Sequence, residues 1–314
     1  MAVQKQTTLR DRVELTGIGV HSGAPVRIVL HPADSNTGIM FLRTRLEGGR
    51  ERLIEARHDR VSATELCTII GDTATGSVAT IEHLLAALCG LGVDNVLVEI
   101  DGPEVPILDG SAAPFVAAID EVGLVRQSAG RRFLKVLKPV RIEQGKAFAE
   151  LRPFSRGFRL EVEIDFDTPV IGRQKKLIDL DPSTFRKEIS RARTFGFMRD
   201  VERLWKAGFA LGASLDNTVA LGEEGVINAE GLRYPDEFSR HKTLDAVGDL
   251  ALAGLPLLAH YRSYCGGHRM NVAVLQALFA DRSAYAIVEA PRREYGRAEA
   301  GALQQAVAFA PDRG

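Results

Sequence analysis

The residues with the clearest spacing for chemistry lie in SRHKTLDAVGDL, at 239–250 of this 314-residue chain. If this stretch is helical, His241, Asp245 and Asp249 share one face, because positions four apart on a helix point the same way. His241 and Asp245 could then bind one ion from consecutive turns, as the two histidines of an HExxH helix do. Asp249 lies one turn too far for the same ion. The alternative is a solvated helix face with a weak His–Asp pair.

A second pair, Glu82 and His83, interrupts the apolar helical pattern of TIEHLLAAL. Burying a carboxylate beside an imidazole costs several kcal/mol unless both are paired or coordinated. Neighbours on a helix point about 100° apart. We therefore expect a division of labour, with His83 as a metal ligand and Glu82 as the base that activates water. With His241 and Asp245 this makes two histidines and one carboxylate, which leaves a position open as a catalytic zinc requires.

The remaining histidines differ in their local sequence. GGH at 266–268 puts His268 on a Gly-rich turn, where Asp249 could hold one ring nitrogen while the imidazole donates a proton to a leaving group. His21 lies among glycines that would let a ligand approach, although turns explain these glycines equally well. Three others are expected to be ordinary surface, core or strand-edge residues: His31, His58 and His260.

Composition narrows the function class. Hydrophobic residues make up 45% of the chain, charged residues 26%, and the net charge is −1, as in a soluble globular protein without the basic excess of nucleic-acid binders. The apolar runs fall short of the ~20 residues of a membrane span, and the N-terminus lacks a signal-peptide core. We therefore expect a cytoplasmic protein with no nucleic-acid partner and no membrane segment. The three cysteines form no CxxC pair, so any metal must use nitrogen and oxygen ligands.

The elements that must position these residues alternate between strands and helices. The first 60 residues predict antiparallel strands, and 94–100 predicts another. Helices are expected over 80–92, capped by Thr80 and ended by Gly90 and Gly92, and after Ser111 as a second cap. The polar stretch 125–132 is expected to link two domains, over 1–126 and 132–314.

The second domain repeats the order of strands followed by helices. Strands are predicted in FLKVLKPVRIE, AFAELRP and FRLEVEIDF, with shorter ones around NTVAL and GVINA. Helices are predicted in STFRKEISRA, capped by Ser183, in VERLWKAG, over 239–250, and in NVAVLQALFA. A run of strands followed by helices occurs twice along the chain, and this order indicates an α+β fold.

Eight stretches together resemble the UDP-3-O-acyl-N-acetylglucosamine deacetylases, the zinc amidases of lipid A biosynthesis. They run in family order from residue 16 to 268: TGIGVHSG, LCT, TIEHLLAAL, GLGVDN, PEVPILDGSAAPF, SRARTFGFMRD, EFSRHKTLDAVGDL and GGH. The resemblance implies two similar α+β domains, each a mainly antiparallel sheet packed on helices, with the active site between them. It also implies hydrolysis of the N-acetyl group of UDP-3-O-(3-hydroxyacyl)-N-acetylglucosamine, which releases acetate in the committed step of that pathway.

The resemblance further implies roles for single residues. His83, His241 and Asp245 would bind Zn²⁺, and Glu82 would be the general base. Three residues would assist: His268 by protonating the leaving amine, Asp249 by orienting His268, and Thr194 by donating to the oxyanion. Lys242 would lie near the substrate's phosphate or sugar. An insert near 194–222 would form a hydrophobic passage for the acyl chain, with core packing as the alternative, and the substrate-binding set would be Leu66, Cys67, Phe195, Phe197, Met198, Val201 and Phe209.

One position departs from the family pattern. A basic residue is expected three positions before the histidine of GGH, and Cys265 stands there. Arg262 or Arg269 would then contact the diphosphate, and Phe166 the uridine. Two other functions remain open: an Fe(II) oxygenase, which uses the same ligand types, and a sugar-nucleotide or acyl-binding module without chemistry. We expect the protein to be a monomer.

Overall fold

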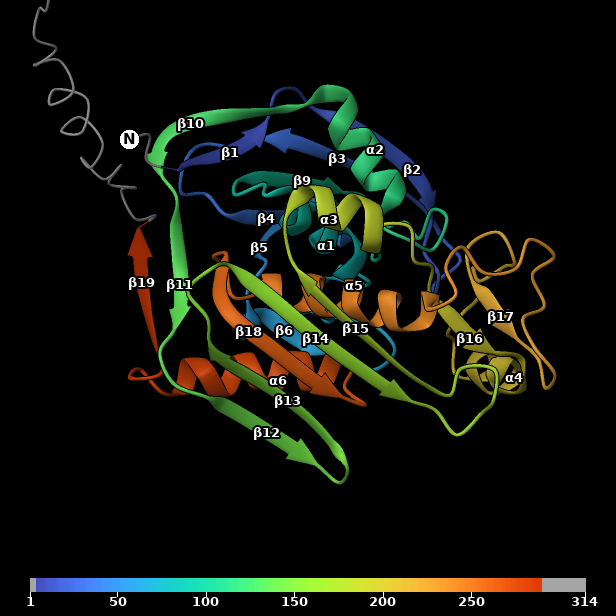
Figure 1. Ribbon diagram of the computed structural model, residues 1–314. Coiled ribbons are helices and arrows are strands. Elements are labelled where there is room, and N and C mark those ends of the chain that lie inside the picture. The colour runs from blue at the N-terminus through green and yellow to red at the C-terminus, as the bar shows by residue number, and fades with distance from the viewer. Residues whose placement is uncertain (1–3, 290–314) are drawn as a thin grey trace, which may run out of the picture.

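The computed structural model describes residues 4–289, in which two main sheets enclose the central helices (Figure 1). The first sheet has the order β2-β3-β9-β4-β5, and its pairs are antiparallel except β4–β9. Its strands are β2 (Val13–Ile18), β3 (Pro25–Pro32), β4 (Ile39–Leu46), β5 (Arg50–Glu55) and β9 (Val96–Ile100). Beside it lies a three-stranded sheet of β6 (Val61–Ala63), β7 (Ile69–Asp72) and β8 (Gly76–Val78).

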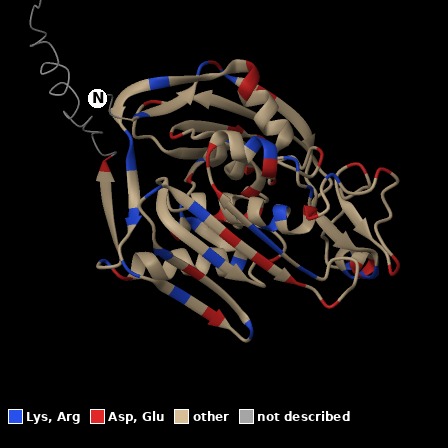
Figure 2. Cartoon of the chain, viewed as in Figure 1, with Lys and Arg blue, Asp and Glu red and all other residues tan. Residues whose placement is uncertain are grey.

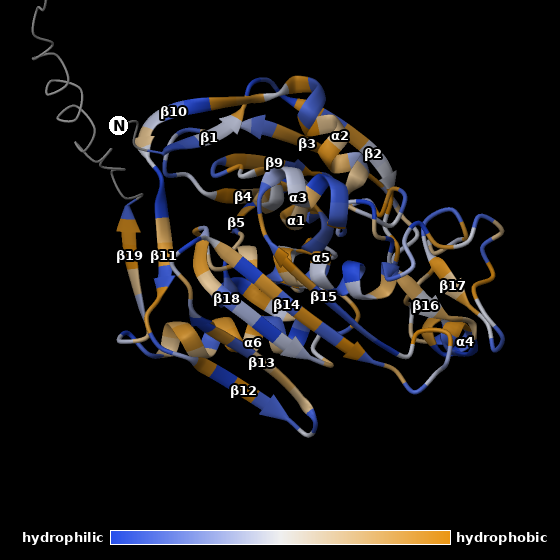
Figure 3. Cartoon of the chain, viewed as in Figure 1, coloured by the Kyte–Doolittle hydropathy of each residue, from blue (hydrophilic) through white to orange (hydrophobic). Residues whose placement is uncertain are grey.

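The second sheet has seven strands, with β18 (Leu257–Tyr264) at its centre. β18 pairs antiparallel with β13 and parallel with β11 and β14. The other strands are β11 (Arg132–Val136), β12 (Val140–Gln144), β13 (Ala147–Pro153), β14 (Phe158–Asp165), β15 (Arg173–Asp179) and β19 (Tyr285–Glu289). Figure 3 shows hydrophobic and hydrophilic residues alternating along β14, because one face of the strand packs on the core and the other meets solvent.

The helices lie between and beside these sheets. They are α1 (Glu82–Leu91), α2 (Ala113–Val122), α3 (Pro182–Thr184) with a π-helical turn over Phe185–Ile189, α4 (Met198–Lys206), α5 (Glu237–Ala251) and α6 (His268–Ala280). Short 3-10 turns cover Glu47–Gly49 and His58–Arg60. β16 (Phe195–Phe197) and β17 (Val219–Leu221) pair in parallel and form, with α4, the lobe at the right of Figure 1. The predicted α+β class with mainly antiparallel sheets is confirmed. No helix within residues 4–289 is long and apolar enough to cross a membrane.

Several local predictions were wrong because contacts with residues distant in sequence determine the backbone conformation there. The segment 125–132, predicted as a linker, is largely strand: β10 (Leu124–Gly130) pairs antiparallel with β1 (Lys5–Leu9). Around GVINA there is no strand, only an isolated bridge between Leu221 and Val226. The stretch RTFGFMRD, for which no element was predicted, contains β16 and the start of α4.

Three helix ends also differ from prediction. Thr80 does not cap α1, because its φ is +56° and its hydroxyl donates to Glu104 at 2.8 Å. Gly92 ends α1 with φ +78°, whereas Gly90 lies within the helix. Asp181 rather than Ser183 caps α3, since its carboxylate accepts from two backbone N–H groups.

Candidate metal centre and active site

The crossing of α1 and α5 brings the predicted metal ligands together. Gly248 on α5 lies against the backbone of Glu82, and a Cβ at Gly248 would be 1.9 Å from the Glu82 carbonyl oxygen. Glycine is therefore required for this approach. The first turn of α1, with Glu82 and His83, thus faces the stripe of His241 and Asp245 on α5.

His83, His241 and Asp245 form a buried group whose candidate ligand atoms all lie within 4.8 Å of one another. Asp245 Oδ1 is 3.6 Å from His83 Nε2 and 3.4 Å from His241 Nε2. Within the described residues, Asp245 Oδ1 is buried without a hydrogen-bond partner. An unpaired buried carboxylate oxygen facing two imidazole nitrogens is costly unless a cation joins them. The three residues therefore fit a metal ion.

A backbone carbonyl group orients the ring of His241. Its Nδ1 lies 3.1 Å from the Ala192 carbonyl oxygen, so an N–H at Nδ1 can donate there and leave Nε2 free to bind a cation. Burial lowers the pKa of His241 to about 3, which keeps the imidazole neutral as a ligand must be.

His268, the first residue of α6, is held by the carboxylate of Asp249. Its Nδ1 is 2.8 Å from Asp249 Oδ2, and its Nε2 is 4.0 Å from Asp245 Oδ2. Asp249 also accepts hydrogen bonds from Thr68 Oγ1 at 2.6 Å and Asn271 Nδ2 at 2.8 Å. Burial opposes the imidazolium, but the negative charge of Asp249 outweighs it and raises the pKa of His268 to about 9. His268 therefore carries a proton at neutral pH.

Glu82 and Lys242 complete the polar side of the site. Glu82 Oε2 accepts from the Thr68 N–H at 3.1 Å, and burial raises the pKa of the Glu82 carboxyl. Lys242 Nζ donates to Asp245 Oδ2 at 2.6 Å and lies 5.7 Å from the centre of the Phe195 ring. Burial disfavours the ammonium, but Asp245 outweighs it and raises the pKa of Lys242.

A cavity of about 460 Å³ opens onto these groups. Most of the predicted set lines it: Leu66, Glu82, His83, Thr194, Phe195, Phe197, Met198, Val201, His241, Lys242, Asp245 and His268. Asp249 does not line it and lies behind His268.

Two predicted substrate-binding residues do not line this cavity. Cys67 is buried, with an exposure of 1%, and burial raises the pKa of its thiol to about 12. Phe209 packs edge-on against His21, with ring centres 5.5 Å apart. Cys67 is thus covered by its neighbours, whereas Phe209 is partly exposed and lies behind His21, which does line the cavity.

Other cavity residues were missed or left open. His21 does line the cavity, in a loop whose N–H groups at His21 and Ser22 donate to the buried Glu104. Leu204 and Trp205 of α4 line it as well. Their apolar side chains in the charged segment VERLWKAG were the available signal.

The residues considered for the diphosphate and uridine lie outside this lining. Arg262 Nε is 3.0 Å from Glu161 Oε2, and Arg269 donates to Gln144. Phe166 packs behind the cavity wall, 5.9 Å from the ring of Phe195. The three histidines expected to be structural do not line it either: His31, His58 and His260.

Comparisons with known proteins agree on one family. The model of the LpxC family, described as UDP-3-O-acyl N-acetylglycosamine deacetylase, matches residues 6–280. Curated relatives named UDP-3-O-acyl-N-acetylglucosamine deacetylase, from Brucella ovis, Brucella canis and Brucella suis, are each 54% identical over 286 residues. These alignments cover 91% of this chain and 99% of each relative. The matched range contains the whole metal group, Glu82 and His268.

Proposed function

Because the chain belongs to the UDP-3-O-acyl-N-acetylglucosamine deacetylase family, we propose that it hydrolyses the N-acetyl group of UDP-3-O-(3-hydroxyacyl)-N-acetylglucosamine. The products are acetate and the free amine, and the reaction is the committed step of lipid A biosynthesis. The observation that carries this function is the buried group of His83, His241 and Asp245 at a cavity with a carboxylate and a protonated imidazole beside it. Such a set can activate a water molecule and protonate the leaving nitrogen, which are the two tasks in the hydrolysis of a linear amide.

The metal proposed for this group is Zn²⁺. Two imidazole nitrogens and one carboxylate oxygen are a usual zinc set, and three protein ligands leave a position free for the reaction. When bound, zinc supplies Lewis acidity toward the amide carbonyl and the attacking water. The protein's own part is to keep the His241 imidazole neutral and the Asp245 carboxylate charged. Burial opposes the charged form of Asp245, but the electrostatic effect of its neighbours, among them the Lys242 ammonium, outweighs it, so the pKa of Asp245 lies well below its usual range.

Proton transfer is assigned to Glu82 and His268. Glu82 takes the proton from the attacking water, and its raised pKa makes it a stronger base than an exposed carboxylate. His268, held by Asp249, delivers a proton to the nitrogen, because an amine anion is too poor a leaving group to depart unaided. The Thr194 hydroxyl is proposed to donate to the oxyanion.

Substrate binding is assigned to the lobe around α4 and to Lys242. The apolar residues of β16 and α4 would pack along the acyl chain, since the hydrophobic effect favours its removal from water. Lys242 would contact an anionic or sugar oxygen of the substrate, while its contact with Asp245 orients the ammonium. The protein is proposed to act as a monomer in the cytoplasm.

The site is proposed to lie between two domains, over 1–126 and 132–314. In support, Glu82, His83 and the His21 loop come from the first range, whereas α5, α6 and the insert near 194–222 come from the second. The catalytic group is complete only when both are in place.

The deciding experiment is an acetate-release assay on the UDP-sugar with and without a chelator. We expect activity to disappear on chelation and to return with zinc. Chelator-insensitive turnover would contradict the metal role, and substrate binding without any acetate release would identify a binding module. Metal analysis under anaerobic conditions, with an O₂-uptake assay, separates zinc from an Fe(II) oxygenase.

A further inference from the structure

A second cavity lies at the far ends of the three helices that carry the active-site residues. Helix α1 begins at the active site and reaches this cavity with Cys89, and α6 runs from His268 to Phe279 in its lining. Helix α5 reaches it with Leu250, the residue after Asp249. The cavity measures about 640 Å³, within the ~300–1,000 Å³ of small-molecule sites.

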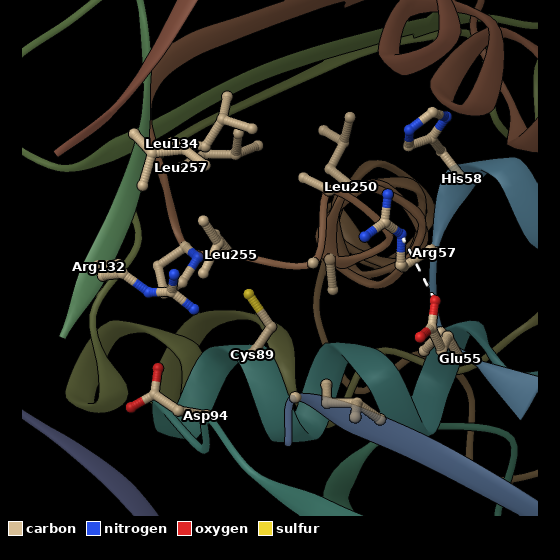
Figure 4. Close-up of a pocket in the computed structure, with 18 of the residues that line it drawn as sticks. Glu55, Arg57, His58, Cys89, Asp94, Arg132, Leu134, Leu250, Leu255 and Leu257 are labelled. Atoms are coloured by element: carbon tan, nitrogen blue, oxygen red, sulfur yellow. Dashed lines mark ion pairs between the residues drawn. The ribbon is translucent and has the colours of Figure 1, made fainter. Parts of the chain in front are cut away.

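One side of this cavity is apolar. Figure 4 shows Leu134, Leu255 and Leu257 gathered on one wall, Leu250 beside them, and the Cys89 sulfur directed toward them from α1. Burial raises the pKa of the Cys89 thiol to about 11, so at neutral pH the thiol is uncharged and behaves as a small hydrophobic group. A ligand with a hydrocarbon body would lose unfavourable contact with water along this wall.

The charged residues around the cavity leave an excess of positive charge. Arg131 Nε pairs with Asp94 Oδ1 at 2.8 Å, and Arg57 Nε lies 3.3 Å from Asp59 Oδ1 and 3.8 Å from Glu55 Oε2, a third acid of the lining. Arg132 and Arg282 also line the cavity and are exposed. Within residues 4–289, neither has a carboxylate within 4.0 Å, although Arg282 donates to the Tyr285 hydroxyl. Guanidinium groups free of carboxylates are suited to bind a carboxylate or phosphate.

The aromatic residues argue against a nucleotide. The rings of His58 and Phe279 stack on each other with centres 4.1 Å apart, and the Arg282 guanidinium lies 5.3 Å from the centre of the Tyr285 ring. A base would have to displace one of these partners to stack.

We propose that this cavity is a second ligand site, which takes a soluble anionic amphiphile. The hydrocarbon body lies against the leucine wall, and the carboxylate or phosphate head is bound by Arg132 and Arg282. The site is separate from the deacetylase site and does not depend on that activity.

The test is isothermal titration of the full chain with dodecyl phosphate or dodecanoate below micelle-forming concentrations. Neutral dodecyl glucoside is the matched ligand without charge. We expect one binding event that is at least about tenfold weaker for the glucoside and for Arg132→Glu/Arg282→Glu. Cys89→Phe, which fills the cavity, should abolish the event. Arg126→Glu, an exposed arginine of β10 outside the cavity, should leave it unchanged.

The single tryptophan separates this cavity from the active site. Trp205 is the only tryptophan of the chain and lines the active-site cavity. Binding at the second cavity should therefore leave Trp205 emission unchanged. If Trp205 emission changes over the same amphiphile concentrations as the heat of binding, the amphiphile binds in the acyl passage and the proposal is overturned. The proposal is also overturned if neither Arg132→Glu/Arg282→Glu nor Cys89→Phe changes the affinity for the amphiphile.

A lipid bilayer also presents hydrocarbon chains with anionic head groups, so it could bind the same residues. Phosphatidylglycerol vesicles provide the second arm, with sedimentation as the readout. The contrary outcome is that the protein sediments with the vesicles, loses this sedimentation in Arg132→Glu/Arg282→Glu, and binds no monomeric amphiphile. That result would show that the two arginines bind a membrane surface, and it would contradict a soluble ligand.

Discussion

Three buried carboxylates lie within or beside the site, and their neighbours give them different properties. Asp245 faces two imidazoles and the Lys242 ammonium, and its pKa lies well below the usual range. Glu82 receives one backbone hydrogen bond, and burial raises its pKa. Asp249 accepts from Thr68, Asn271 and the ring of His268. These differences suit a metal ligand, a base and an orienting group respectively.

The base can be tested by Glu82→Gln. The amide keeps the shape of the side chain but cannot take a proton, so we expect kcat to fall about 10²- to 10⁴-fold. Metal content and melting temperature should stay close to those of the unmodified protein, because Glu82 is outside the metal group. Near-normal acetate release by a zinc-loaded variant would refute the assignment.

At the scale of elements, the site depends on how closely α1 approaches α5. Gly248→Ala tests this approach, because the new Cβ would be 1.9 Å from the Glu82 carbonyl oxygen. The helices must then separate, which should cost about 1–3 kcal/mol of stability. Zinc affinity should fall as well, since His83 follows Glu82 on α1.

Gly225→Ala is the matched control, as a Cβ there meets nothing within 4 Å. Metal titration and thermal unfolding of the two variants provide the comparison. Equal zinc affinity in both would show that the close approach does not position the ligands.

On the second sheet, the mainly acidic charged residues of β14 lie beside the mainly basic ones of β15, as Figure 2 shows. Glu161 on β14 accepts hydrogen bonds from Lys175 at 2.6 Å and Arg262 at 3.0 Å. Burial favours the neutral acid, but these cations outweigh it and lower the pKa of Glu161 to about 2. The ionised carboxylate therefore links β15, β14 and β18.

Glu161→Gln should reduce the free energy of unfolding by about 1–2 kcal/mol at pH 7. Because the folded pKa of about 2 lies below the ordinary glutamate pKa of 4.5, the carboxylate's contribution to stability is complete above pH 4.5 and is lost as the pH falls toward 2. Urea titrations across this range should therefore show the difference from the unmodified protein shrinking as the pH falls. Glu121→Gln, an exposed acid of α2, should show little difference at any pH.

For the whole molecule, the active-site cavity exists only when segments far apart in the chain meet. Its lining extends from Val20 to His268 and includes apolar side chains of α4. A bulky residue in α4 should therefore shorten the acyl passage while leaving the catalytic groups in place.

Val201→Trp tests the passage. We expect KM for the long-chain substrate to rise about 10- to 100-fold, since displacing a few methylenes from an apolar wall forfeits ~0.8 kcal/mol each. Turnover of an analogue with a short acyl chain should change little. Equal effects on both substrates would show that the chain does not pass along α4.

Much of the site was predictable because helical spacing is a local property. His241 and Asp245 at i and i+4, and the charged pair in the apolar TIEHLLAAL, indicated the ion-binding group that the structure brings together. The α+β class likewise followed from the order of strand and helix patterns. Helix caps were less predictable, because the Thr80 hydroxyl bonds to Glu104, which is distant in sequence.

The sequence by itself thus determined the fold class, the family and the set of groups for metal and proton chemistry. Only the tertiary structure decided that 124–130 pairs with β1, that Cys67 and Phe209 lie outside the active-site cavity, and that a second cavity forms at the far helix ends. The physical reason is distance along the chain. Periodicity fixes which side chains share a face, whereas burial and cavities depend on which remote segments pack against that face.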